Sequence, residues 1–332
     1  MHDAAFLFVV AVVICALAFD FINGFHDTAN AIATSVTTRA IRPGVAIMMA
    51  ATLNFLGALY STGVAKTIGG DIVSSPEMVN QEVILAALLG AIFWNLVTWK
   101  IGIPSSSSHA LIGGLVGSAL MFNGFSALNP SGILKILASL VLSPIAALVG
   151  GCTIMIALLW IFGRMAPSLL NEKFKKMQIL SAATMSFSHG ANDAQKAMGI
   201  ITLALLSGGY IPTLDVPLWV KLSAAIAMGL GTAMGGWKII RTMGGKIFKL
   251  EPISGFAADL NSSLVIFAAT LLHLPVSTTH VVSGSIMGVG VAKRVKAVRW
   301  STAQQMLMAW VLTIPISAIV SALCYQIIVW IF

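Results

Sequence analysis

The sequence predicts an all-α integral membrane protein made of two inverted repeats, each with a broken helix, full spans and a re-entrant hairpin, in about 12 helical segments. Its composition, 58% hydrophobic and 9% charged residues, is typical of a protein surrounded by lipid. Apolar stretches of membrane-spanning length recur along the chain, and they are continuous, whereas a β-barrel has short alternating segments. Two kinds of polar motif occur once in each half, which indicates an internal repeat.

The order of the apolar segments gives the expected domain organisation. The first repeat covers 1–165 with a hairpin at 83–122, and the second covers 177–332 with a hairpin at 254–292. The polar stretch 166–176 between them is expected to be a cytoplasmic connecting loop. We expect six segments in each half, at about 4–22, 27–38, 44–65, 83–101, 106–122 and 136–163, and at about 177–188, 193–207, 217–239, 254–273, 277–292 and 303–331.

Breaks inside the apolar stretches predict helices that do not simply cross the membrane. Residues 23–27 interrupt the first long stretch and divide it into two half-helices. Pro104 and Pro275 each join two apolar arms with almost no polar linker, which favours a re-entrant hairpin over two crossings. The backbone at the tip of such a hairpin must be buried in protein or line a wet cavity.

The charges of the loops indicate how the two halves are oriented. Three crossings and one hairpin per half make the crossing number odd, so the second half lies upside down relative to the first. Arg39 and Arg42 follow the first broken span, and the matching loop 203–217 has no basic residue. The loop 66–82 is acidic, and its counterpart 238–251 is basic. By the positive-inside rule, both termini lie outside a prokaryotic inner membrane. The basic residues are topology signals and do not indicate nucleic-acid binding.

Hydroxyl-rich helix starts at the two hairpin tips are the first candidate binding groups. The stretches Pro-Ser-Ser-Ser-Ser-His and Pro-Val-Ser-Thr-Thr-His occupy equivalent positions in the two halves. Hydroxyls and free N–H groups at a helix start donate to an oxyanion, and the helix dipole favours negative charge there. The alternative is plain N-capping. The candidate substrate ligands are Ser105, Ser106, Ser107, Ser108, Ser277, Thr278 and Thr279.

Two carboxylates inside apolar stretches are the candidate groups for cation coupling. Asp27 and Asp193 occupy the same repeat position, and ionisable groups at membrane depth are candidates for function. A carboxylate beside an oxyanion site requires a cation, which is either Na⁺ or a proton carried on the carboxyl itself. Na⁺ would also be coordinated by Asn23, Asn30 and Asn192 and by free carbonyls. The alternative is a helix cap or a structural hydrogen bond; Asp20 and Asp259 are weaker candidates.

Three further polar residues are possible accessories to this site. His109 and His280 follow the hydroxyl runs, where they either donate to the anion, relay a proton or hold the tip in shape. Lys196 stands where the first repeat has Asn30, either as a counter-charge to Asp193 or as an attraction for the anion. Small residues near the tips, namely Gly113, Gly117, Gly284 and Gly288, favour close helix packing.

At these motifs the chain resembles the inorganic phosphate transporter (PiT) family. Gly190-Ala-Asn-Asp193 matches the duplicated hallmark of the family, and Gly24-Phe-His-Asp27 is a looser copy. The duplicated Pro-x-Ser-x-x-His tips are also similar, and the resemblance covers essentially the whole chain. It implies cation-driven secondary transport of inorganic phosphate by a homodimer of inverted repeats. The chain lacks the large cytoplasmic insert of eukaryotic members, which implies a compact prokaryotic protein.

One departure from the family bears on the coupling ion. Sodium-coupled eukaryotic members have a glutamate in the second long helix, where this chain has Asn54. We therefore expect an importer of inorganic phosphate with no enzymatic activity and no cofactor, coupled to a cation, with H⁺ slightly favoured over Na⁺. The alternatives are transport of another tetrahedral oxyanion such as sulfate, and an uncoupled anion channel.

Overall fold

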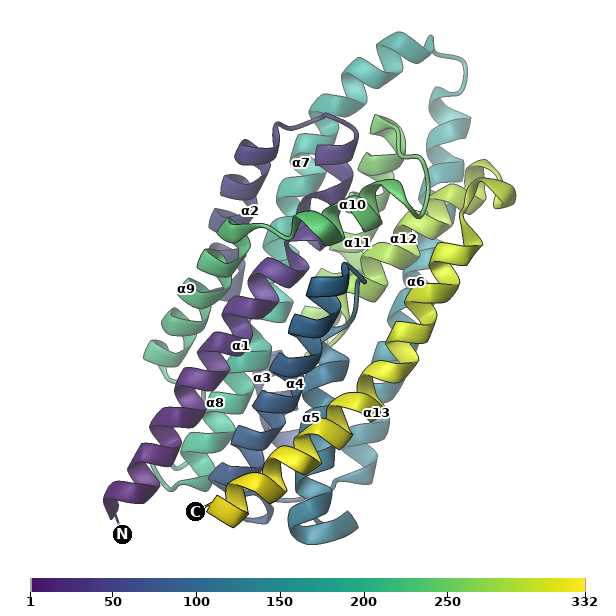
Figure 1. Ribbon diagram of the computed structural model, residues 1–332. Helices are drawn as coiled ribbons and strands as arrows, with labels where there is room; N and C mark the ends of the chain where they lie inside the picture. The colour runs from purple at the N-terminus through teal and green to yellow at the C-terminus, as the bar shows by residue number, and fades with distance from the viewer. Residues whose placement is uncertain (1, 332) are drawn as a thin grey trace.

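The computed structural model describes residues 2–331, which are helical apart from short connections and one isolated β-bridge (Figure 1). The predicted all-α, multi-span class is confirmed. In the first half the α-helices are α1 (His2–Thr37), α2 (Pro43–Ala58), α3 (Gly63–Asp71), α4 (Gln81–Ile101), α5 (Ser107–Asn123) and α6 (Pro130–Phe162). In the second half they are α7 (Pro167–Asp193), α8 (Gln195–Ser207), α9 (Leu218–Met234), α10 (Trp237–Gly245), α11 (Pro252–Leu271), α12 (Thr278–Lys293) and α13 (Trp300–Ile331).

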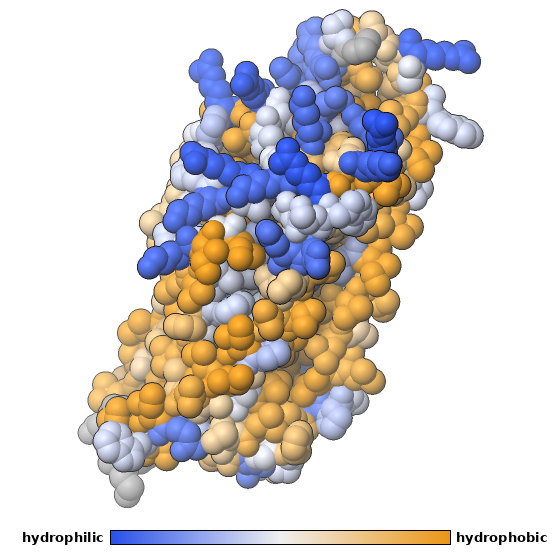
Figure 2. Space-filling model, turned by 45° about the vertical axis from the view of Figure 1, so that its right-hand side comes forward, coloured by the Kyte–Doolittle hydropathy of each residue, from blue (hydrophilic) through white to orange (hydrophobic). Residues whose placement is uncertain are grey.

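The outer faces of the long helices are built for lipid. Six of the described helices, among them α1, α6 and α13, are long and apolar enough to cross a membrane. Only 17% of the most apolar window of α6 and 28% of that of α13 is buried inside the protein. Figure 2 shows the resulting hydrophobic surface, with hydrophilic residues gathered at one end of the molecule.

The two halves run in opposite directions and pack on each other. In Figure 1, α1 rises from the end that carries both termini, and α7 descends from the other end. The packing partners exchange in the same way: α5 lies along α13 and α12 along α6, while α1 packs on α9 and α2 on α7. The tips of the hairpins α4–α5 and α11–α12 consequently meet in the interior.

The structure does not have the first helix break that the sequence analysis predicted. The predicted interruption at 23–27 is wrong, because α1 continues through it for 36 residues. The polar side chains of this segment contact α4, α7 and the hairpin tips, while the backbone stays helical. In the second half a single turn residue, Ala194, separates α7 from α8.

The large bends lie in two stretches that were predicted to be continuous. The pair α2 and α3 bends by 68°, and the pair α9 and α10 bends by 73°. Gly235, with a φ of 70°, and Gly236 supply the second bend, because an L side chain rarely adopts that backbone conformation. Each short helix, α3 or α10, then turns toward a hairpin.

The expected connecting loop 166–176 is also helical for most of its length. Helix α7 begins at Pro167, so only residues 163–166 link the two halves. Phe174 is buried and packs edge-on against Phe162 and Phe256, with ring centroids 5.4 Å away in both cases. This apolar anchor makes the charged stretch one exposed face of a helix.

Glycines allow the close crossings that bring the hairpins together, as predicted. A Cβ at Gly113 or Gly117 would collide with carbonyl oxygens of α13, and one at Gly284 or Gly288 with those of α6. The motif glycines act alike, because Gly24 lies against α9 and Gly190 against α2. The polar motifs are thereby held at fixed depth on α1 and α7.

Candidate functional site

The two hairpin tips form the floor of a buried polar site. None of the seven predicted tip residues is more than 2% exposed. Ser106 and Ser277 are helix caps, since their Oγ atoms accept hydrogen bonds from the backbone N–H groups of His109 (3.1 Å) and His280 (3.3 Å). Ser108 Oγ donates to the carbonyl oxygen of Val276 at 2.8 Å and ties one tip to the other. The capping interpretation therefore accounts for Ser106 and Ser277. Ser105 Oγ lies 2.8 Å from Thr98 Oγ1, so Ser107, Thr278 and Thr279 are the tip hydroxyls that face the carboxylates.

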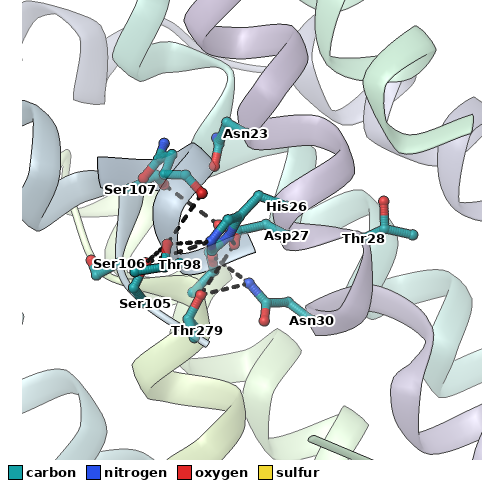
Figure 3. A network of polar contacts seen from close by, with 12 residues as sticks. Asn23, His26, Asp27, Thr28, Asn30, Thr98, Ser105, Ser106, Ser107 and Thr279 are labelled. Atoms are coloured by element: carbon teal, nitrogen blue, oxygen red, sulfur yellow. Dashed lines mark hydrogen bonds and ion pairs between the residues drawn. The ribbon is translucent and has the colours of Figure 1, made fainter. Parts of the chain in front are cut away.

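Asp27 receives hydroxyls from both tips. Ser107 Oγ lies 3.4 Å from its Oδ2, and Thr279 Oγ1 lies 3.3 Å from its Oδ1. His26 Nδ1 is 2.7 Å from the same Oδ1, and its Nε2 lies 3.1 Å from Thr98 Oγ1 on α4. Figure 3 shows these side chains of α1 facing the hairpin, whereas Thr28 points away from it. The carboxylate is thus held by both halves of the protein.

Asp193 is the centre of a second, equivalent group. Its Oδ2 accepts hydrogen bonds from Asn23 Nδ2 at 3.3 Å and from Thr278 Oγ1 at 3.2 Å. Lys196 Nζ lies 2.9 Å from the same oxygen and also donates to Ser107 Oγ at 3.1 Å. Lys196 therefore links the carboxylate of the second half to the tip of the first.

The other two candidate asparagines, Asn30 and Asn192, make different contacts. Asn30 Nδ2 donates to Thr278 Oγ1 at 3.2 Å and to Thr279 Oγ1 at 3.0 Å, so it belongs to the site. Asn192 instead donates to Thr270 Oγ1 at 3.0 Å and to the carbonyl oxygen of Leu274 at 3.3 Å. The Asn192 amide nitrogen thus fixes the arm of the second hairpin, while its Oδ1 is buried and accepts no hydrogen bond from the described residues.

One residue of the site, His189, escaped the sequence analysis, and so did its contact with Asn54. His189 Nε2 lies 3.5 Å from Asp193 Oδ2, and its Nδ1 lies 3.1 Å from Asn54 Oδ1. Asn54 in turn donates to Thr232 Oγ1 at 2.9 Å. A signal was present, because His189 stands at the repeat position of Asn23. The polar line Asn54–His189 connects the second long helix to the buried carboxylate.

The site has oxygen ligands suited to a cation. Asp27, His189 and Asp193 each offer a ligand atom, and these atoms lie within 4.8 Å of one another. The side-chain oxygens Asn23 Oδ1, Asn30 Oδ1 and Asp193 Oδ1 are buried and accept no hydrogen bond from the described residues. Buried acceptors of this kind are costly unless they bind a ligand, and hard cations prefer oxygen.

The tip histidines lie behind the hydroxyls. Their ring centroids are 4.6 Å apart, and the His280 ring stacks on Trp310 at 3.8 Å. His109 Nδ1 contacts Ser106 Oγ at 2.7 Å. Both rings line an apolar cavity of about 470 Å³ between α6 and α13. This geometry fits the interpretation in which the histidines hold the tips in shape.

The weaker candidates lie outside this network of contacts. Asp259 accepts a hydrogen bond from Thr34 Oγ1 at 2.5 Å, beyond Asn30 along α1. Asp20 precedes Asn23 on α1, is buried, and accepts no hydrogen bond from the described residues.

The connection between the two arms of each hairpin is called its neck here. Each neck is held by a short helix of the other half, α3 or α10. Thr67 Oγ1 of α3 donates to the carbonyl oxygen of His273 at 2.8 Å, and Thr242 Oγ1 of α10 donates to that of Gly102 at 3.0 Å. Both acceptor residues have positive φ, 58° and 78°. A polar cavity of about 610 Å³ lies at the neck near His273, and a smaller one of about 240 Å³ lies at the neck near Gly102. Each cavity therefore adjoins one neck.

A multi-span fold with a buried site that joins anion donors to cation ligands defines a membrane transport protein. The chain belongs to the phosphate transporter family, which it matches over residues 23–321; this is a family of transporters and not of enzymes.

The relatives agree with this assignment. A probable low-affinity inorganic phosphate transporter of Bacillus subtilis is 55% identical over 99% of this chain and 100% of its own length. One of Rhizobium meliloti is 49% identical over 97% of this chain and 96% of its own length. Among solved structures, the sodium-dependent phosphate transporter superimposes with a TM-score of 0.88 at 28% identity, covering 98% of this chain and 100% of that one.

Proposed function

We propose that this protein imports inorganic phosphate by symport with a cation. One observation carries the proposal: the hydroxyls of both tips share hydrogen bonds with Asp27 and Asp193 in one buried cluster. Hydroxyls and helix starts suit an oxyanion that must leave again, and the carboxylates suit the cation that accompanies it. Phosphate would contact Ser107, Thr278 and Thr279 near the bilayer midplane.

The coupling ion is proposed to be H⁺ in preference to Na⁺. Asn54 has an amide where a carboxylate would strengthen a sodium site. Its Oδ1 directly contacts His189 Nδ1. His189 and His26 each contact a motif carboxylate, which gives a proton nitrogen and oxygen positions to occupy. Na⁺ remains the alternative, supported by the free oxygens of Asn23 and Asn30.

The alternatives to phosphate symport are less well supported. Sulfate has the same tetrahedral oxygens, so the tip hydroxyls do not by themselves distinguish it. An uncoupled anion channel has no need for two buried carboxylates beside the anion donors.

Orientation and assembly are part of the proposal. Both termini lie at one end of the molecule, and the basic loops 38–42, 163–166, 245–251 and 294–299 lie at the other (Figure 1). We place the basic end in the cytoplasm of a bacterial plasma membrane. We also propose two inverted repeats joined at 163–166, and a homodimer. In this arrangement α6 and α13 form a scaffold against which the other elements rock.

Uptake of radiolabelled phosphate into proteoliposomes tests the function. Imposed pH and Na⁺ gradients are applied separately, with sulfate as competitor. We expect uptake to follow the pH gradient and to resist sulfate. Asp27→Asn should abolish gradient-driven uptake, whereas Asp215→Asn, an exposed carboxylate in the loop before α9, should leave it intact. Uptake that ignores both gradients would contradict symport.

A further inference from the structure

The two halves of the site differ at one position that the proposed function leaves open. Asn30 and Lys196 both stand three residues after a motif aspartate, Asp27 in α1 and Asp193 at the end of α7. The first half therefore has an amide where the second half has an ammonium. Lys196 is among the largest fully buried side chains of the protein.

We propose that the Lys196 ammonium is a built-in cation that takes the place of one of two exchangeable coupling cations. This inference rests on the proposed symport. It means that the protein moves one cation fewer per phosphate than a carrier of this design with asparagine at both positions.

The charges of the cluster require such a cation. Ligand atoms of Asp27 and Asp193 lie within 4.8 Å of each other, and two carboxylates at that separation repel strongly in a buried site. Lys196 neutralises one of them at 2.9 Å. One further positive charge balances the Asp27 carboxylate, so for this pair of carboxylates a single mobile cation suffices where two are otherwise needed.

The contacts of Lys196 are those expected of a cotransported ion. Its Nζ bridges the Asp193 carboxylate and the Ser107 hydroxyl, which is an anion donor from the opposite half. A bound metal ion would likewise bridge the carboxylate and the anion. The covalent stem of Lys196 prevents this charge from leaving with the substrate. A lysine ammonium also has three N–H donors, of which these contacts use two.

The first half retains the space for a mobile ion. Asn30 uses its Nδ2 for the second tip, and its Oδ1 accepts no hydrogen bond from the described residues. Asp27 and this free oxygen lie on one face of α1, three residues apart. The mobile cation is therefore assigned to the Asp27 side and the fixed one to the Asp193 side.

The inference is tested by the number of charges moved per phosphate. This test works for either coupling ion, H⁺ or Na⁺. Proteoliposomes are loaded with phosphate and held at fixed pH and Na⁺. The measured quantity is the imposed membrane potential at which the net flux of phosphate is zero. Lys196→Asn should raise the charge moved per phosphate by one, and Lys66→Asn, an exposed lysine paired with Asp215, should not change it. An unchanged charge number with a raised KM would overturn the inference, because Lys196 would then be only a ligand of the anion. Failure of the unmodified protein to take up phosphate would instead refute the proposed function.

A binding measurement decides the matter if Lys196→Asn does not transport. Thermal unfolding of the purified variant is followed over a series of Na⁺ concentrations and of pH values, with phosphate present. Ligands that bind only the folded state stabilise it. The slope of the unfolding free energy against the logarithm of the ligand concentration reports how many are bound. The variant should show the uptake of one additional cation relative to the unmodified protein, and an identical ion dependence would overturn the inference.

Discussion

At the scale of single residues, the tip hydroxyls are joined across the two halves. Ser107 contacts Asp27 and Lys196, and Thr278 contacts Asp193 and Asn30. Hydrogen bonds to charged groups contribute about 1.5–3 kcal/mol each. The double substitution Ser107→Ala and Thr278→Ala should therefore raise the KM for phosphate at least about tenfold or eliminate uptake. Ser126→Ala, at an exposed hydroxyl, is the control; a double variant with the KM of the control would remove the tips from the site.

Much of the site was predictable because its residues occur twice. The hydroxyl runs and the motif aspartates were found by comparing the two halves, and all of them lie in the buried cluster. His189 and His26 were harder to predict, because their repeat partners are Asn23 and Asn192, residues of another type. The contacts of the Asn192 amide nitrogen were not predictable, because they come from the arm of a hairpin, which no local pattern reveals.

At the scale of helices, the depth of the second motif depends on a close crossing of α7 and α2. A Cβ at Gly190 would collide with the carbonyl oxygen of Asn54. Gly190→Ala should destabilise the protein by about 1–3 kcal/mol through overpacking, seen as a lower melting temperature in detergent. Gly44→Ala, with no atom within 4 Å of its added Cβ, should leave the melting temperature equal or slightly higher. Equal melting temperatures for both variants would contradict the crossing.

The helices α3 and α10 give a second prediction, which concerns access to the site. Thr67→Val removes the hydrogen bond to the neck at His273 and favours opening there by about 1 kcal/mol, or about fivefold. An impermeant maleimide should then label Leu274→Cys about five times faster, and Ile103→Cys at an unchanged rate.

Thr242→Val is the matched converse, because it frees the neck at Gly102. It should speed the labelling of Ile103→Cys and not that of Leu274→Cys. Equal acceleration at both positions would show that the two necks do not move separately.

The bends themselves were not predictable from hydropathy. The stretches 44–65 and 217–239 are mainly apolar, with scattered polar residues such as Asn54 and Lys221, so hydropathy alone favours one helix each. The bend of the first lies at residues 59–62, which contain no proline and no glycine. Conversely, the polar residues at 23–27 suggested a break, but they lie within an intact helix and contact side chains of α4, α7 and the hairpin tips.

At the scale of the whole molecule, the distribution of loop charge fixes a testable orientation. Ser126 is exposed in the connection between α5 and α6, which lies at the end that carries the termini, and Lys296 is exposed in the connection between α12 and α13, which lies at the opposite end. In intact cells an impermeant maleimide should label Ser126→Cys and spare Lys296→Cys until the membrane is opened. Labelling of both from outside would refute the proposed arrangement.

The overall architecture followed from sequence more fully than its details. Apolar length, the duplicated motifs and the alternation of loop charge predicted the class and the opposed direction of the halves. The helical start of α7 was missed because Phe174, its apolar anchor, stands alone among charged residues.

Each motif carboxylate is contacted from both halves, Asp27 by Thr279 and Asp193 by Asn23. A hairpin that withdraws therefore takes donors from the anion and a partner from a carboxylate in the same movement. Neither solute then keeps a complete coordination shell while the other departs. In the proposed symport, these shared ligands would suppress leakage of phosphate or cation alone without a separate gate.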